Sequence, residues 1–464
     1  MLLLLASLLF YAWAGVWFLL VLAGSILVNH AAAILIAGMR DRGHRRSSSN
    51  IFILGVTANL GLLAVFKYTD FLTLNLKTLG IQFGVPPLTL PSAAIPLGLS
   101  FITFKAISYL VDVSRNHTTP HRNLMITALY LSVFPQVVAG PISRYGDLAP
   151  QCINRSATLE NLSRGAERFI IGLAKKVLVA DAVARVADKI FMIPVSHLTG
   201  GVAWLGAVCY TFQIYFDFSG YTDMAIGLGL MFGFTFVENF NYPYVSRSIT
   251  EFWHRWHISL STWLRDYLFL PMAYSLSRRF DTQNLFGVQL DPVFWSYIIG
   301  TLITMSLAGL WHGANWTFVV WGAVFGVFLV IERSRLGKRI KSLWSPLRHG
   351  YALLVIIAAW VVFRSDSLSA AFGYLRSMFG FATGDGIDYF PAMYLNNELI
   401  IVLCAALAGS MPVAQMIGRR FPGPGVTLPH TYRFARILFA ALIFIVSLLT
   451  LSGGTNNPFI YFRF

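Results

Sequence analysis

The chain has 464 residues, of which 56% are hydrophobic and only 12% are charged, and its mean hydropathy is +0.64. Soluble domains average about 25% charged residues, so this composition excludes a soluble protein and predicts an integral membrane protein with one polytopic domain, residues 1–464. The net charge of +15 indicates cytoplasmic loops and anionic lipid headgroups rather than nucleic acid, because no basic run carries interleaved aromatic residues on a soluble segment.

The N-terminal part of the chain alternates apolar segments with short basic loops. Residues 1–39 are almost entirely apolar and lack a basic start or a cleavage site, so they predict two short spans hinged at Ala14–Gly15 rather than a signal peptide. Further spans are expected at residues 51–66, 95–111 and 124–140, with basic loops at residues 40–46 and 115–122 between them. Positive charge resists translocation, so both loops are expected to lie in the cytoplasm.

The remainder of the chain begins with a different pattern. Between residues 143 and 187 charges are frequent and apolar residues recur at helical spacing, which predicts an amphipathic helix in the membrane interface. A long apolar stretch follows at residues 201–236. Later spans are expected at residues 351–363, 399–417 and 437–451, and the most basic loop, residues 332–341, is expected in the cytoplasm. The total is about ten to twelve transmembrane or re-entrant segments.

Residues 293–331 are apolar throughout, and tyrosine aside, His312 is their only charge-capable side chain. One helix of that length would be about 58 Å long, whereas the hydrocarbon core of a bilayer is about 30 Å thick. The stretch therefore predicts two crossing segments with residues 309–316 at their junction. An ionisable side chain at membrane depth is costly and indicates function. The alternative is a histidine that only hydrogen-bonds at a helix junction.

Residues 251–270 combine three tryptophans with ionisable side chains, namely Glu251, His254, Arg255, His257, Arg265 and Asp266. Such a segment cannot face lipid, so it must be buried in protein or line a watery cavity. His254 and His257 lie three residues apart and share a helix face. No nearby Cys or HExxH pattern completes a metal site, so none is predicted. Arg265 and Asp266 are interpreted as a structural ion pair at a break in the helix.

Asp217 and Asp223 lie within the apolar stretch 201–236. One interpretation is structural: they neutralise buried arginines such as Arg255 or Arg265, because unpaired charges are not tolerated in such surroundings. The other is a catalytic carboxylate pair of the kind that glycosidases use. The structural interpretation is favoured because each aspartate has a cation available.

Several motifs together resemble the membrane-bound O-acyltransferase family, and its alginate O-acetyltransferase membrane subunit branch most closely. They are Gln213–Gly229, Asn239–Leu270 and Leu310–Asn315, with further matches at Ala139–Arg144 and Asn457–Phe462. The resemblance covers nearly the whole chain, with a signature core at about residues 201–332. It implies an all-α integral membrane bundle with a tunnel through the membrane, and a chain that begins one helix later than its relatives.

The resemblance places the two histidines of the family on His257 and His312, facing each other in that tunnel. Acyl transfer from a thioester to a hydroxyl needs a base and a group that stabilises the oxyanion. His312 is expected to be the base, since loss of hydration favours a neutral imidazole, and His257 to orient the acceptor or to donate to the oxyanion. Other tunnel or substrate-binding residues are expected to be Trp311, Asn315, Trp256, Ser261 and Arg255.

The implied activity is transfer of an acyl group, acetyl from acetyl-coenzyme A, across a bacterial inner membrane onto an exported or cell-surface polysaccharide. No metal or resident cofactor is implied. The implied partners are an extracytoplasmic SGNH-type transferase or a small accessory membrane protein, and membrane lipids. D-alanyl transfer to a cell-envelope polymer is an alternative. A secondary transporter, from another class, would also have broken helices and buried charges.

Overall fold

The computed structural model describes residues 1–84, 94–279, 291–381, 389–413, 430–453 and 458–460, and all regular secondary structure in these ranges is helical. The predicted all-α class is therefore confirmed. The chain forms two compact units: residues 1–166 with 225–237, and residues 167–224 with 238–464. The prediction of one domain over residues 1–464 stays a prediction. Residues 414–417 of an expected span, and Asn457, Tyr461 and Phe462 of the C-terminal motif, lie outside the described residues.

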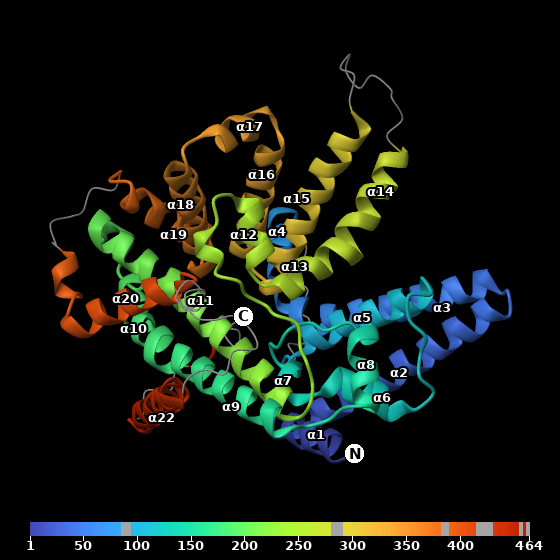
Figure 1. The fold of residues 1–464 in the computed structure, drawn as a ribbon. Helices are drawn as coiled ribbons and strands as arrows, with labels where there is room; N and C mark the ends of the chain where they lie inside the picture. The colour runs from blue at the N-terminus through green and yellow to red at the C-terminus, as the bar shows by residue number, and fades with distance from the viewer. Residues whose placement is uncertain (85–93, 280–290, 382–388, 414–429, 454–457, 461–464) are drawn as a thin grey trace. The chain divides into compact units, whose positions relative to one another are not determined.

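The first unit begins with the predicted hinge. Its first elements are α1 (Leu2–Ala14), α2 (Val16–Asp41), α3 (Arg45–Leu63), a π-helix (Ala64–Tyr68) and α4 (Thr69–Gln82). Gly15 separates α1 from α2 with a φ of 155°, a conformation that glycine adopts far more readily than other residues. Helices α2 and α3 then run side by side (Figure 1).

The expected span at residues 124–140 is broken. The elements here are α5 (Leu99–Ser114), α6 (Leu124–Ser132), α7 (Phe134–Val137) and α8 (Tyr145–Ile153). The break between α6 and α7 follows from Pro135, which has no backbone N–H and cannot continue the hydrogen bonding of α6. Gly98 precedes α5 so close to α7 that a Cβ would lie 1.9 Å from the carbonyl oxygen of Val137.

The region that was expected to be amphipathic contains α9 (Leu159–Ala174), a π-helix (Lys175–Ala180) and α10 (Asp181–Phe191), followed by α11 (Gly200–Met231). Helix α10 buries Val183, Ala187 and Ile190, which share one face, so this helix is amphipathic. Gly172 of α9 and Gly220 of α11 lie against each other. A Cβ on either would come within 2.7 Å of the other's carbonyl oxygen, so glycine permits this close packing.

The remainder of the second unit contains α12 (Ile249–Arg255), α13 (Ile258–Leu264), a π-helix (Arg265–Phe269), α14 (Leu270–Arg279), α15 (Pro292–His312), α16 (Trp316–Arg333), α17 (Arg335–Ser342), α18 (Ser345–Arg364), α19 (Leu368–Met378), α20 (Asn397–Gly409) and α22 (His430–Ser452). Helices α15 and α16 pack together (Figure 1) and are joined at residues 313–315. The prediction of two segments within residues 293–331 is therefore confirmed.

Six of the described helical segments are long and apolar enough to cross a bilayer. They are Val16–Asp41, Arg45–Gln82, Pro292–His312, Trp316–Arg333, Ser345–Arg364 and Phe434–Ser452. The expected total of ten to twelve also counted shorter segments, and α1 and α20 are shorter apolar helices. The composition and these helices together describe a multi-pass membrane protein.

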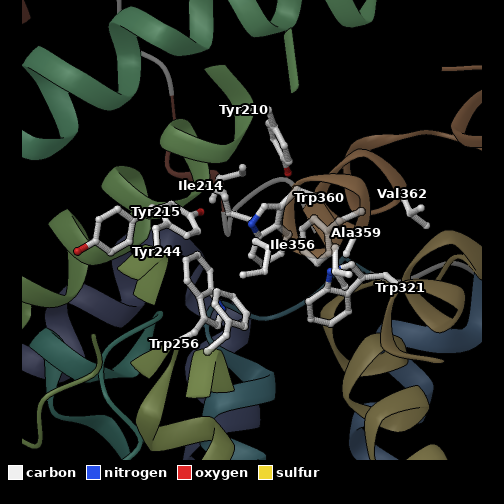
Figure 2. Close-up of a cluster of buried hydrophobic side chains, with 14 of the residues drawn as sticks. Tyr210, Ile214, Tyr215, Tyr244, Trp256, Trp321, Ile356, Ala359, Trp360 and Val362 are labelled. Atoms are coloured by element: carbon white, nitrogen blue, oxygen red, sulfur yellow. The ribbon is translucent and has the colours of Figure 1, made fainter. Parts of the chain in front are cut away.

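Aromatic residues dominate the core of the second unit (Figure 2). Trp360 of α18 lies between Trp321 of α16 and Trp256, with ring-centroid distances of 5.7 Å and 4.9 Å. Large apolar rings contribute strongly to burial and, as rigid side chains, hold helices at defined separations. This core connects α16 and α18 to α12 and to Trp256, the residue before His257.

Candidate active site

The junction between α12 and α13 places His257 in a left-handed backbone conformation, with φ 43° and ψ 53°. A bulky residue rarely adopts this conformation unless its surroundings impose it. Asn239 supplies those surroundings. Its Oδ1 lies 3.1 Å from His257 Nδ1 and accepts hydrogen bonds from the backbone N–H and the hydroxyl of Ser259. Its backbone oxygen accepts the N–H of Ile258 at 2.9 Å.

This network determines the tautomer of His257. A backbone N–H can only donate, so the Asn239 atom that it contacts must be the amide oxygen. The imidazole Nδ1 beside that oxygen is therefore the protonated nitrogen. In a neutral imidazole the other nitrogen, Nε2, then carries the lone pair. The fully buried His257 thus presents a proton acceptor through Nε2.

His312 is the last residue of α15 and is buried among aromatic rings. Its ring centroid lies 5.1 Å from that of Trp321 and 5.4 Å from that of Phe363. Gly313 follows it in extended conformation, where a Cβ would lie 2.1 Å from the Phe318 ring. The absence of a side chain at Gly313 therefore lets the chain turn beneath that ring directly after the histidine.

Both histidines contact the same side chain, Trp311. Its ring centroid lies 6.4 Å from that of His257 and 4.8 Å from that of His312. Two imidazoles that are 55 positions apart in the sequence are thus gathered around one indole. The predicted tunnel that they would face stays a prediction.

Three further residues from the sequence analysis serve the structure itself. Asn315 caps α16: its Oδ1 accepts the N–H of Thr317, and its Nδ2 donates to the carbonyl of Asp366. Trp256 lies in the aromatic core (Figure 2). Arg255 forms an ion pair with Glu251 at 3.0 Å, within its own helix. Roles of these three residues in substrate binding stay predictions.

A pocket of about 410 Å³ lies among α12, α13, α15, α16 and the π-helix after α13. Ser261, which the sequence analysis assigned to substrate binding, lines it. His254, to which no catalytic role was assigned, lines it too. His257 and His312 do not line the pocket, although Ile258, the next residue after His257, does. The volume is within the range of small-molecule sites.

Sequence reasoning missed the hydroxyl groups that α15 contributes to this pocket. Tyr297, Thr301 and Thr304 of α15 all line it. They are spaced four and three residues apart, which places them on one face of the helix. This spacing of polar residues in an otherwise apolar segment is visible in the sequence and could have predicted the polar face of α15.

The structure corrects the partners that were suggested for the two aspartates. Asp217 lies 2.7 Å from Lys176, and Asp223 lies 2.7 Å from Lys175 and 2.9 Å from Arg168. Neither pairs with Arg255 or Arg265, because the cations of α9 and the following π-helix pack against α11. Ion pairs between residues more than 40 positions apart cannot be predicted from the spacing of residues in the sequence.

Lys176 is shared by two carboxylates. It lies 2.7 Å from both Asp217 and Asp181, and the backbone N–H of Ile460 donates to Asp217 at 2.7 Å. Burial raises the pKa of Asp181 to about 6, although the Lys176 ammonium opposes the rise. This buried network holds α11, α10 and the C-terminal segment together.

The remaining predicted pair, Arg265 and Asp266, lies at the start of the π-helix after α13, 2.8 Å apart. Both side chains are partly exposed, so this pair contributes little to stability. Among the residues that the structure describes, no three His, Cys, Asp or Glu side chains gather closely enough to hold a metal ion.

Comparison with known proteins adds independent findings. The model of the membrane-bound O-acyltransferase family matches residues 100–295. A probable alginate O-acetylase of Pseudomonas putida is 40% identical over all of this chain and 94% of its own length. A peptidoglycan O-acetyltransferase of Helicobacter pylori is 35% identical over 82% of this chain and 73% of its own. A teichoic acid D-alanyltransferase of Bacillus subtilis is 26% identical over 70% of this chain and 78% of its own.

Proposed function

We propose that this chain, which belongs to the membrane-bound O-acyltransferase family and is a multi-pass membrane O-acyltransferase, moves an acetyl group across the membrane for the O-acetylation of an exported or cell-surface polysaccharide. The acetyl donor is acetyl-coenzyme A, and the enzyme lies in a bacterial inner membrane. Two of the relatives are named for O-acetylation, of alginate and of peptidoglycan, and these names support an acetyl group and a glycan acceptor.

One observation carries the proposal: two buried imidazoles are gathered around Trp311, and Ile258, which follows one of them, lines a pocket that can accept a small molecule. A buried imidazole is suited to proton transfer. The aromatic rings around His312 exclude water, which would otherwise hydrolyse a bound thioester.

The reaction uses these groups as follows. The acceptor oxygen attacks the thioester carbonyl carbon and forms the new C–O bond, while His312 takes the hydroxyl proton. The C–S bond then breaks, and the departing thiolate receives that proton. His257 accepts a hydrogen bond through Nε2, as its tautomer requires. The proton of the reacting hydroxyl goes to His312, so the donor to His257 is a different O–H or N–H group of the acceptor, and this favours orientation of the acceptor over donation to the oxyanion.

The pocket suits the arm of the donor. Its walls are apolar with hydroxyl groups at intervals, which matches a chain that contains amides and a thioester. Arg265 and His254 also line it and supply donors for anionic phosphates. On the far side of the membrane, an SGNH-type transferase or a small accessory membrane protein would receive the acyl group.

D-alanyl transfer is the second candidate, and the similarity to a teichoic acid D-alanyltransferase supports it. The two O-acetylating relatives are more similar, at 40% and 35% identity against 26%. Acetyl transfer is therefore the better supported reaction.

The test uses membranes that contain the enzyme, its neighbouring envelope proteins and the native polysaccharide. These membranes receive either acetyl-coenzyme A with a labelled acetyl group or a labelled D-alanyl thioester. We expect base-labile label in the polysaccharide from acetyl-coenzyme A only. Label from the D-alanyl thioester alone would favour the second candidate, and transport of solute without thioester consumption would contradict both.

A further inference from the structure

Helix α12 depends on another helix for its first hydrogen bonds. The first N–H groups of a helix have no acceptor within it. In α12 the N–H of Glu251 donates to the Ser248 hydroxyl at 3.0 Å. The N–H groups of Ile249 and Thr250 instead donate to the carboxyl group of Glu332, at 2.5 Å and 2.9 Å. Glu332 lies 82 positions further along the chain, at the end of α16.

Glu332 acts only as an acceptor. Besides the two N–H groups, it accepts the Thr250 hydroxyl at 2.6 Å and the Tyr351 hydroxyl at 3.3 Å. Four donors around one buried carboxyl group match an ionised carboxylate, which has acceptor sites and no proton to give. Two of these donors are the first N–H groups of α12.

The contact sets one wall of the pocket. Thr250, Trp253 and His254 of α12 line the pocket, and so does Leu329, which precedes Glu332 by about one turn of α16. The separation of α12 from α16 at this point therefore depends on Glu332. His257, by contrast, is held by Asn239.

We infer that Glu332 is a positioning residue that fixes the α12 wall of the pocket and thereby the binding of the acyl donor. The donor part rests on the proposed function, whereas the holding of α12 does not. Asn239 positions His257 for the reaction itself. Substitution of Glu332 should therefore change donor binding, and substitution of Asn239 should change turnover, so the two roles can be measured separately.

Glu332→Gln is the informative change. Glutamine has nearly the same shape but replaces one acceptor oxygen with an NH₂ group, which would point at an N–H donor of α12. One buried donor then loses its acceptor, and such a loss corresponds to a change of about tenfold or more in an equilibrium constant. Asn239→Ala is the comparison variant. Glu398→Gln, whose exposed carboxylate pairs with Arg185, is the matched control.

Three measurements on the purified full chain separate the possibilities. Hydrogen exchange follows the amides of residues 249–252, and the dissociation constant of S-ethyl-coenzyme A reports donor binding. Turnover of saturating acetyl-coenzyme A, with the native polysaccharide and the neighbouring envelope proteins added to supply the acceptor, reports kcat. In Glu332→Gln we expect exchange and the dissociation constant each to rise about tenfold, with kcat within about twofold. In Asn239→Ala we expect kcat to fall, with little change in the exchange of these amides or in the dissociation constant. In Glu398→Gln we expect no change in any of the three quantities.

Unchanged exchange in Glu332→Gln would overturn the inference, and so would faster exchange with an unchanged dissociation constant. If the wild type fails to bind S-ethyl-coenzyme A, the proposed donor is refuted, while faster exchange still supports the role of Glu332 in holding α12. If Glu332→Gln does not accumulate, Glu332→Asp, which keeps the charge but is shorter by one methylene, should show intermediate exchange. Full protection in that variant would contradict the inference.

Discussion

His257 occupies a backbone conformation that costs of order 1–3 kcal/mol for a residue other than glycine. Asn239 compensates for that cost with contacts to His257, Ile258 and Ser259, and in doing so determines which imidazole nitrogen carries the proton. At the scale of single residues, the candidate site therefore consists of two buried histidines and of neighbours that hold them in place. Substitutions of the histidines and substitutions of the residues around them should therefore differ in their effects on activity and on folded yield.

Substitution of His312 should abolish acyl transfer without lowering the amount of folded protein in the membrane. His312→Gln keeps a hydrogen-bonding side chain but cannot take the proton, so acetyl transfer should fall by about 10²–10⁴-fold. His312→Ala should be equally inactive. Transfer from labelled acetyl-coenzyme A in purified membranes, normalised to the amount of protein, measures the effect. A wild-type rate in His312→Gln would leave this histidine with a structural role only.

Asp217 should behave differently, because its carboxylate partners the buried Lys176 and the N–H of Ile460. Asp217→Asn leaves an ammonium group with one carboxylate fewer, and breaking a buried pair costs about 3–5 kcal/mol. Folded yield, measured by size-exclusion chromatography in detergent, should therefore fall together with activity. Full folded yield without activity would instead support the catalytic interpretation of the carboxylates.

At the scale of elements, the helix pair α15–α16 carries His312 at its junction and packs through small residues. A Cβ on Gly309 would lie 2.0 Å from the carbonyl oxygen of Phe318, and one on Gly322 would lie 2.0 Å from that of Met305. Close backbone approach of this kind is typical of helices that associate within a membrane. The position of His312 thus depends on two glycines with no chemistry of their own.

Gly309→Ala or Gly322→Ala should force these helices apart. Overpacking costs about 1–3 kcal/mol or more when the contact is with backbone rather than with a flexible side chain. The melting temperature in detergent should fall, and activity with it. Gly350→Ala in α18 is the control, since a Cβ there meets nothing within 4 Å and alanine favours a helix. A control that destabilises as much as Gly309→Ala would refute the packing argument.

At the scale of the whole molecule, the basic loops should set the orientation in the membrane. Residues 40–46, 115–122 and 333–341 each carry at least two arginines or lysines, and such loops tend to stay in the cytoplasm. The last of them follows α16 directly and includes the short helix α17, whose basic side chains are exposed. If this prediction holds, the end of α16, and Glu332 with it, lies near the cytoplasmic surface.

Cysteine labelling tests this orientation. The three native cysteines, Cys152, Cys209 and Cys404, are free and must first be replaced. Ser334→Cys should then resist a membrane-impermeant maleimide in intact cells and react after permeabilisation. Modification without permeabilisation would reverse the proposed orientation and the side from which the donor approaches.

The sequence by itself determined the membrane class, the hinge at Gly15 and the division of residues 293–331 into two helices. These features depend on local quantities, namely hydropathy, segment length and the conformational freedom of glycine. It also singled out the two histidines that the structure gathers around Trp311, because the motifs that contain them are contiguous in the chain. The hydroxyl face of α15 was within its reach as well, since helical spacing is local.

Only the tertiary structure decided which residues complete the site. Lys175 and Lys176, rather than Arg255 or Arg265, partner the aspartates. Asn239 holds His257, and Glu332 holds a helix that begins 83 positions before it. The physical reason is common to these cases: a buried polar group must find a partner, and the partner is whichever donor or acceptor the packed helices bring within hydrogen-bonding distance. That choice depends on three-dimensional packing, which local patterns do not encode.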